Sequence, residues 1–331
     1  MNQLKFNAPW DPLQHVLVGR SYQPAFYKPI KNSRIRNALQ KIAHETEEDY
    51  QNLISILQEL SIKVDRPGIG SEKTIMDYVD ADGVLNYSSA KSFTLIPRPP
   101  MQPRDSILIV GDTLIAANDE INCFDNLIPN NKPPHSFDAP LVTVIGTHLI
   151  VDCREHPWLA DYVQQCCPDR TVIPVMIGGH NDAVFCPVAP GLIISTYHHT
   201  NYADTFPGWE VKFIENQSWN AIPGWRTFKH SNVNKWWVPD GDNNPEFANF
   251  VDTWLTNWTG YVQETVFDVN MLQINSNTVL VNNYNCEMFE WFKTKKIEPI
   301  IVPFRHRFFW DGGIHCITAD LYREGESYRY L

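Results

Sequence analysis

The sequence repeats one simple pattern: a short apolar strand, a tight turn and a second apolar strand. Each copy carries Gly, Asn, Asp or Pro at its centre, where a hairpin needs turn residues. Four copies lie at residues 107–117, 141–151, 183–195 and 271–281. A half copy at residues 15–20 lacks a neighbouring partner, and we expect it to pair with a strand at residues 314–321.

Segments with helical spacing of apolar residues lie between these hairpins, and we interpret them as core helices. They lie at residues 41–60, 158–166, 244–258 and 288–292, and strand-like tails follow at residues 62–64, 171–175 and 297–302. The predicted unit is thus a hairpin, a helix and a further strand. Because one such unit cannot bury a face alone, the units should stack around one core. We therefore expect an α/β fold and one domain over residues 1–331, with a Trp-rich embellishment at residues 219–237.

Composition narrows the class of protein. The formal net charge is −11 and there is no long basic run, which argues against a nucleic-acid partner. There is neither a bilayer-spanning apolar stretch nor a secretory signal at the N-terminus, so no membrane partner is expected. The seven cysteines are odd in number and include no Cys-x-x-Cys pair. We expect a cytoplasmic protein with reduced, mostly buried thiols.

Cys316 and His180 are the candidate chemical residues, and each follows a Gly-Gly pair. Singly, a cysteine in an apolar strand is usually structural, and the histidine could be structural or functional. Three aspartates lie at strand edges or turns, where each alone would be a turn or cap residue. These are Asp105, Asp138 and Asp182. Without a second pair of spaced ligands beside His315 and Cys316, a metal site is not expected.

Taken together, these residue types indicate a thiolate enzyme with a cationic substrate. A thiolate can attack an electrophilic carbon and hold it covalently, and a histidine can move the protons that this requires. Carboxylates can bind a guanidinium or amidinium through paired hydrogen bonds.

Five blocks, in chain order, resemble the amidinotransferases of the guanidine-modifying superfamily, such as glycine amidinotransferase and inosamine-phosphate amidinotransferase. The resemblance covers nearly the whole chain except the Trp-rich stretch, and His-Cys behind Gly-Gly is its most specific element. The blocks are residues 10–20 (WDPLQHVLVGR), 103–111 (PRDSILIVG), 137–139 (FDA), 180–185 (HNDAVF) and 312–323 (GGIHCITADLYR).

The resemblance implies a five-bladed α/β propeller, the pentein fold, with the site on its pseudo-fivefold axis. It implies that Cys316 is the nucleophile, that His180 is the general acid and base, and that Asp138 orients His180. Asp105 and Asp182 would hold the guanidinium. The implied reaction is ping-pong transfer of an amidino group from a small guanidine donor, arginine by default, to an amine acceptor. It needs no metal or organic cofactor. Family members are often dimers, which makes a homodimer one expected assembly.

The chain departs from the family pattern at the donor's carboxylate end. His199 is nearest to the position of an arginine that binds the donor's α-carboxylate in the family, which makes it a substrate-binding candidate. Two family serines fall near residues 263–264, where the chain has Gln and Glu. We therefore expect weak discrimination between arginine and donors without that carboxylate. If a carboxylate clamp exists elsewhere, Arg305 and Arg307 are the first candidates.

Two other functions remain open from the sequence. A hydrolase of the same superfamily, such as a deiminase, would use similar residues with water as the acceptor. A non-catalytic propeller that only binds a partner would have no reason to hold the cysteine, histidine and aspartates together. The acceptor amine is open as well.

Overall fold

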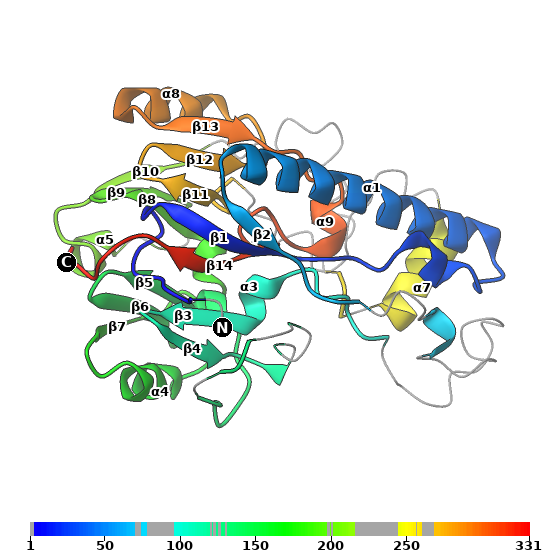
Figure 1. Cartoon of the computed structure of the whole chain (residues 1–331), viewed down its shortest axis with the longest axis horizontal. Coiled ribbons are helices and arrows are strands. Elements are labelled where there is room, and N and C mark those ends of the chain that lie inside the picture. The colour runs from blue at the N-terminus through cyan, green and yellow to red at the C-terminus, as the bar shows by residue number, and fades with distance from the viewer. Residues whose placement is uncertain are drawn as a thin grey trace.

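The computed structural model describes residues 3–69, 74–77, 96–119, 121, 124, 127–129, 131–196, 199, 201–215, 244–255, 257–259 and 268–331. It is an α/β structure in which small sheets alternate with helices along the chain. Figure 1 shows the sheets side by side and the long helix α1 extending away from them, with α7 beside it. Among the described helices, none has both the length and the apolar character that a bilayer crossing requires.

One sheet joins the two ends of the chain. Strand β1 (Leu13–Val18) pairs antiparallel with β14 (Thr318–Arg323), which confirms the predicted pairing of the terminal strands. On its other side β1 pairs in parallel with β2 (Lys63–Asp65), which confirms the first predicted strand tail.

Three further sheets share the predicted plan. Each has an antiparallel hairpin, then a helix, then a strand that pairs in parallel with the second hairpin strand. In chain order they contain β5 (Val142–Ile145), β6 (His148–Asp152) and β7 (Thr171–Val175); β8 (Phe185–Ala189), β9 (Leu192–Ser195) and β10 (Glu210–Phe213); and β11 (Leu272–Asn275), β12 (Thr278–Val281) and β13 (Glu298–Ile301). The sequence analysis missed β10, because its two apolar residues alternate with charged ones and give too short a pattern.

The remaining sheet is the hairpin of β3 (Ile107–Val110) and β4 (Thr113–Ala116). A single parallel bridge between Ile115 and Asn131 lies where the other sheets have a third strand. The described part of the chain thus contains five small sheets, one for each predicted hairpin.

The helices follow the predicted apolar stripes. Helix α1 (Ser33–Glu59) begins earlier than expected, because the Asn32 side chain accepts hydrogen bonds from two backbone N–H groups of its first turn. Helix α7 (Pro245–Trp254) begins after Asn244, whose side chain caps it, and its apolar face shares a core with α1. The Trp-rich stretch lies outside the described residues. The other helices and helical turns are η1 (Pro24–Tyr27), η2 (Ile75–Asp77), α4 (Leu159–Cys166), α5 (Tyr202–Thr205), α8 (Cys286–Lys295) and α9 (Arg307–Trp310).

Six described cysteines are free thiols, and most of them are buried, as predicted. Cys286 is exposed and Cys166 is partly exposed, whereas Cys123 lies outside the described residues. The buried ones are Cys153, Cys167, Cys186 and Cys316.

Short helical turns lead into the first strands of three hairpins. They are α3 (Pro103–Ser106) before β3, η4 (Ala139–Leu141) before β5 and η5 (Asn181–Ala183) before β8. The turn η4 contacts both α3 and η5, and α3 contacts β14. The ends of these hairpins therefore meet, and the residues just before each first strand are brought close together.

Candidate active site

The candidate site is assembled from residues that precede the first strand of each hairpin. Asp105 lies in α3, Asp138 directly precedes η4, and Asp182 lies in η5. Asn270 and Cys316 occupy the corresponding places before β11 and β14. Each sheet thus contributes at least one of these side chains, which explains how residues far apart in sequence share one site.

Cys316 lies in a tight turn and not in a strand, because β14 begins only at Thr318 and not at residue 314 as expected. The turn is held by an asparagine from the neighbouring sheet. Asn270 Oδ1 accepts hydrogen bonds from the backbone N–H groups of His315 at 3.0 Å and of Cys316 at 3.3 Å. These bonds fix the backbone at the thiol and satisfy N–H groups that the turn leaves buried.

The Gly-Gly pair before this turn is required by close packing, not by flexibility. A Cβ at Gly313 would lie 2.5 Å from Asn270 Oδ1 and 2.8 Å from Asn282 Nδ2. A Cβ at Gly312 would lie 2.1 Å from Gln102 Nε2. Neither contact is sterically allowed, so a side chain at either position would displace the residues that hold the turn.

The thiol of Cys316 is buried and has two polar neighbours. Asn270 Nδ2 lies 3.0 Å from its Sγ, and Asp182 Oδ2 lies 3.7 Å from it. Burial and the charges of Asp182 and Asp105 raise the pKa of the Cys316 thiol well above its ordinary value, against a smaller opposing effect of Asn270. In the free protein the thiol therefore holds its proton.

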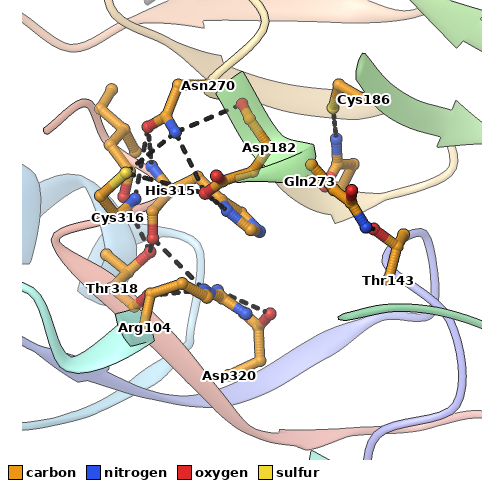
Figure 2. A network of polar contacts seen from close by, with 12 residues as sticks. Arg104, Thr143, Asp182, Cys186, Asn270, Gln273, His315, Cys316, Thr318 and Asp320 are labelled. Carbon is orange, nitrogen blue, oxygen red and sulfur yellow. Dashed lines mark hydrogen bonds and ion pairs between the residues drawn. The ribbon is translucent and has the colours of Figure 1, made fainter. Parts of the chain in front are cut away.

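Asp182 is shared by the residues around the nucleophile (Figure 2). Its Oδ2 accepts hydrogen bonds from His315 Nδ1 at 2.7 Å and from Asn270 Nδ2 at 3.2 Å. Burial opposes ionisation, but the bond from His315 and nearby positive charges lower the pKa of Asp182 below its ordinary value. Its other oxygen, Oδ1, is buried and has no hydrogen-bond partner in the described part of the chain.

Asp105 repeats this arrangement on another turn. Its side chain is buried, with Arg98 Nη1 at 3.8 Å from Oδ2 and no partner for Oδ1 among the described residues. Burial raises the pKa of Asp105 to about 7, against the opposing charges of His180 and Arg98. A buried carboxylate oxygen without a partner is unfavourable, and a bound N–H donor would relieve it.

His180 is paired with Asp138, as the sequence analysis predicted. His180 Nε2 lies 3.2 Å from Asp138 Oδ2. Burial acts to lower the pKa of His180, but the bond to Asp138 and the charges of Asp105, Asp182 and Asp138 outweigh it and raise this pKa to about 10. The ring is therefore protonated at neutral pH and can act as an acid.

The loop that leads into His180 is held by Asp152, at the end of β6. Its carboxylate accepts hydrogen bonds from three consecutive backbone N–H groups, those of Ile177 at 2.9 Å, Gly178 at 2.7 Å and Gly179 at 3.0 Å. Gly178 and Gly179 have φ values of 83° and 156°, so this loop needs glycine. The sequence analysis did not identify Asp152.

No contact among the described residues links His199 to Cys316, His180 or the three predicted aspartates. The described contacts of His199 are with Thr205, Phe185 and Tyr202, within its own unit. Burial lowers the pKa of His199, which makes it a poor cation near neutral pH. The residues at 263–264 lie outside the described part of the chain.

The two alternative arginines have other roles. Arg305 forms ion pairs with Glu48 at 2.7 Å and Asp49 at 2.8 Å on helix α1. Arg307 donates to the backbone oxygen of Phe304 at 3.0 Å. Neither guanidinium is directed toward the Cys316 turn by a described contact.

Sequence reasoning also missed Asn270 and His315 as site residues. Asn270 could have been found from its position before a hairpin, which matches that of Asp105. His315 precedes the nucleophile, but nothing in the sequence indicates its bond to Asp182. Within the residues described, no cluster of three or more His, Cys, Asp or Glu side chains is arranged to hold a metal ion.

Comparisons with known proteins agree with this architecture. No family model matches the chain, and no curated protein matches it. Among solved structures, an amidinotransferase of the saxitoxin biosynthetic pathway from Microseira wollei matches with a TM-score of 0.70 at 16% identity, covering all of both chains. Inosamine-phosphate amidinotransferase from Streptomyces griseus matches with a TM-score of 0.66 at 17% identity, covering 100% of this chain and 99% of the other.

A hydrolase has a related structure. Dimethylarginine dimethylaminohydrolase from Pseudomonas aeruginosa matches with a TM-score of 0.51 at 9% identity, covering 93% of this chain and 98% of that one. The chain therefore has the fold of these enzymes. The resemblance to the amidinotransferases that five sequence blocks predicted is confirmed at the level of the fold.

Proposed function

We propose that this chain, which has the fold of the amidinotransferases, is itself an amidinotransferase that uses Cys316 as its nucleophile. One observation carries the proposal. Two buried carboxylates whose charges act on the thiol, Asp105 and Asp182, each keep one oxygen without a hydrogen-bond partner in the described part of the chain. A planar guanidinium has N–H donors that suit two such acceptors.

Binding of the cation would prepare the nucleophile. Asp105 and Asp182 raise the pKa of the thiol through their charges. A guanidinium held by both would offset those charges and lower that pKa toward neutrality. The thiol proton then passes to solvent, so the ionisation of Cys316 is coupled to the presence of its substrate.

The chemistry then proceeds in two halves. Cys316 Sγ forms a bond to the guanidinium carbon, the bond from that carbon to the leaving nitrogen breaks, and His180 protonates the leaving amine. The acceptor reacts as the free amine, having lost its ammonium proton to solvent. As its nitrogen attacks the amidino carbon, the neutral His180 takes the proton that this nitrogen loses, and the bond from carbon to Sγ breaks to return the thiolate. Asp138 holds the ring of His180 and stabilises its charged form.

The proposal includes a wider assignment. The five sheets would be the blades of a five-bladed α/β propeller, with residues 1–331 as one catalytic domain. Arginine is the default donor, and a small amine is the acceptor. A cytoplasmic location and a homodimer are part of the same proposal.

The test is direct observation of the covalent intermediate. The protein is incubated with arginine or with agmatine and no acceptor, and its Cys316 peptide is examined by mass spectrometry for an amidino adduct. Adding amines should then discharge the adduct as guanidino products. Cys316→Ser should form no adduct, because a hydroxyl is a far weaker nucleophile.

Other outcomes would change the assignment. Ureido product with ammonia would identify a hydrolase instead. An adduct on another cysteine, with Cys316 unmodified, would overturn the choice of nucleophile.

A further inference from the structure

The second histidine of the site, His315, makes a contact that the proposed reaction does not use. Its Nδ1 lies 2.7 Å from Asp182 Oδ2, and its residue directly precedes the nucleophile. His180 is bonded to Asp138 instead. The site therefore contains two histidine–carboxylate pairs, and the pair built on His315 includes the carboxylate that lies against the thiol.

The donors around Asp182 converge on one of its two oxygens. His315 Nδ1 and Asn270 Nδ2 both donate to Oδ2, at 2.7 Å and 3.2 Å. A carboxylate group can rotate about its bond to Cβ, so these two bonds select one orientation. In that orientation Oδ1 stays buried and unpartnered among the described residues.

The surroundings of His315 favour a neutral ring. Burial and the positive charge of Arg104 lower the pKa of His315, against the opposing effect of Asp182. Arg104 is itself held by Asp320 at 2.9 Å and by the backbone oxygen of Thr318 at 3.0 Å. A neutral ring that faces an ionised carboxylate through Nδ1 must carry its one proton on that nitrogen.

The His315–Asp182 pair also lines a pocket of about 70 Å³ that is partly open to solvent. Its polar lining includes Arg104, Asp182, Gln273, His315 and Asp320, and Cys316 is not part of it. A cavity of this size has room for ordered water, which needs polar partners. Water there can hydrogen-bond to the ring without displacing the proton on Nδ1.

We propose that His315 is a positioning residue, which donates from Nδ1 to Asp182 Oδ2 and so presents Asp182 Oδ1 to the substrate cation. The proposal rests on the proposed function, which assigns Asp182 to the guanidinium. In this role His315 itself transfers no proton to or from the reacting atoms. The specificity of the site for a cation over a neutral group of the same shape then depends on a hydrogen bond from behind the carboxylate.

Two substitutions separate this role from others. The amide nitrogen of Asn lies near the position of Nδ1, whereas that of Gln lies near the position of Nε2. His315→Asn should therefore keep the donor to Asp182, and His315→Gln should lose it. A residue that transferred protons would tolerate neither change.

The measurement uses two alkylating reagents of the same shape. 2-Chloroacetamidine carries an amidinium charge and 2-chloroacetamide is neutral; in both, the Cys316 Sγ–carbon bond forms, chloride leaves and the thiol proton passes to solvent. Alkylation of Cys316 is followed by peptide mapping, and the ratio of the two rates gives the preference for the cation. The neutral reagent controls for changes in the thiol itself.

We expect the wild-type preference to persist in His315→Asn. In His315→Gln it should fall by about tenfold, the effect of one hydrogen bond to a charged group, with little change in the rate for 2-chloroacetamide. Equal ratios in all three proteins would overturn the proposal, and so would equal losses in both variants.

A matched control lies in the first sheet. His15 is a buried histidine that pairs with Asp65 through Nε2 at 2.8 Å. His15→Asn should weaken that pair and leave the cation preference unchanged. A drop in the preference there would mean that the assay reports general loss of structure.

The wild-type protein offers a reading that needs no variant. Nitrogen-15 NMR of labelled histidines should show a neutral ring with its proton on Nδ1, and the absence of any such ring would overturn the proposal. The test is separable from that of the proposed function. If arginine and agmatine give no amidino adduct, the transferase assignment fails; if they do but the Asn and Gln variants behave alike, only the role of His315 fails.

Discussion

Asp152, at the end of β6, and His180 are linked through the loop between β7 and η5. The carboxylate of Asp152 accepts the N–H groups of the three residues that directly precede His180. Asp152 makes no described contact with the ring of His180. Asp152 instead holds the backbone that positions His180.

Replacing Asp152 with Asn tests this link. An amide can accept on one side only, so its NH₂ group would face the backbone donors of Gly178 and Gly179. We expect the free energy of unfolding to fall by about 2–3 kcal/mol, as for buried donors left unpaired, and turnover to fall with it. Urea unfolding and kcat measure the two effects. Asp204→Asn, at an exposed position, is the control, and an Asp152→Asn protein with wild-type stability would contradict the link.

The proposed binding of the guanidinium by Asp105 and Asp182 is tested by Asp105→Asn and Asp182→Asn. Each change keeps the shape and removes one negative charge. Loss of one charge-assisted contact should lower kcat/KM by roughly ten- to hundredfold. Circular dichroism checks the fold of each variant. Wild-type kcat/KM in both variants would rule out guanidinium binding by these two carboxylates.

The pH dependence of kcat/KM should carry the signature of Asp105. Its pKa is raised to about 7, so it is neutral below that pH and ionised above it. Because a neutral carboxyl attracts a cation only weakly, kcat/KM should decline as the pH falls through about 7, and the free enzyme determines this profile. In Asp105→Asn that decline should disappear. A wild-type profile that is flat from pH 8 to pH 6 would contradict the assignment.

The same carboxylates that should favour cation binding should disfavour ionisation of the Cys316 thiol. Its pKa is raised by burial and by Asp182 and Asp105, so its thiolate increases with pH beyond the ordinary thiol value of about 8.5. The rate of alkylation by neutral 2-chloroacetamide should keep rising with pH and reach no plateau below about pH 8.5. At pH 7.5, Asp182→Asn should react faster than wild type with the neutral reagent, although more slowly with 2-chloroacetamidine. A slower reaction with both reagents would show that Asp182 does not act through its charge.

Donor specificity tests the departure at His199. That side chain is packed against Phe185 and Tyr202, and its lowered pKa leaves it uncharged near neutral pH. We expect arginine and agmatine to differ in kcat/KM by less than about a hundredfold, near 2.7 kcal/mol. A larger preference for arginine would reveal a carboxylate partner elsewhere. The ion pairs of Arg305 with α1 make it a poor choice for that partner.

The repeated strands could be read from the sequence because a hairpin is a local structure. Apolar runs and their turn residues lie within about a dozen positions, so the copies at residues 107–117 and 141–151 can be recognised from the sequence. The pairing of the terminal strands followed from the unpaired half copy at residues 15–20. The exception was β10, whose four residues give too little pattern and whose place is set by pairing with β9.

The identities of the site residues were also accessible, because the sequence blocks that carry them resemble those of the amidinotransferases. Cys316, His180, Asp138, Asp105 and Asp182 were all predicted, and the structure brings them together. The pairing of Asp138 with His180 was part of that prediction, but the contacts around Asp182 were not accessible. His315 and Asp182 are 133 positions apart, and their bond exists only because two turns from different sheets meet.

The sequence by itself determined the kind of unit and the chemical groups at its ends, since both depend on neighbouring residues. Only the tertiary structure decided that His315 holds Asp182, and which carboxylate oxygens have no partner among the described residues. It also decided that Gly313 packs against Asn270 and Asn282, and that His199 contacts Thr205, Phe185 and Tyr202. These outcomes depend on distances of a few ångströms between separate sheets, and such distances follow from how the sheets pack around a common core, which no local pattern encodes.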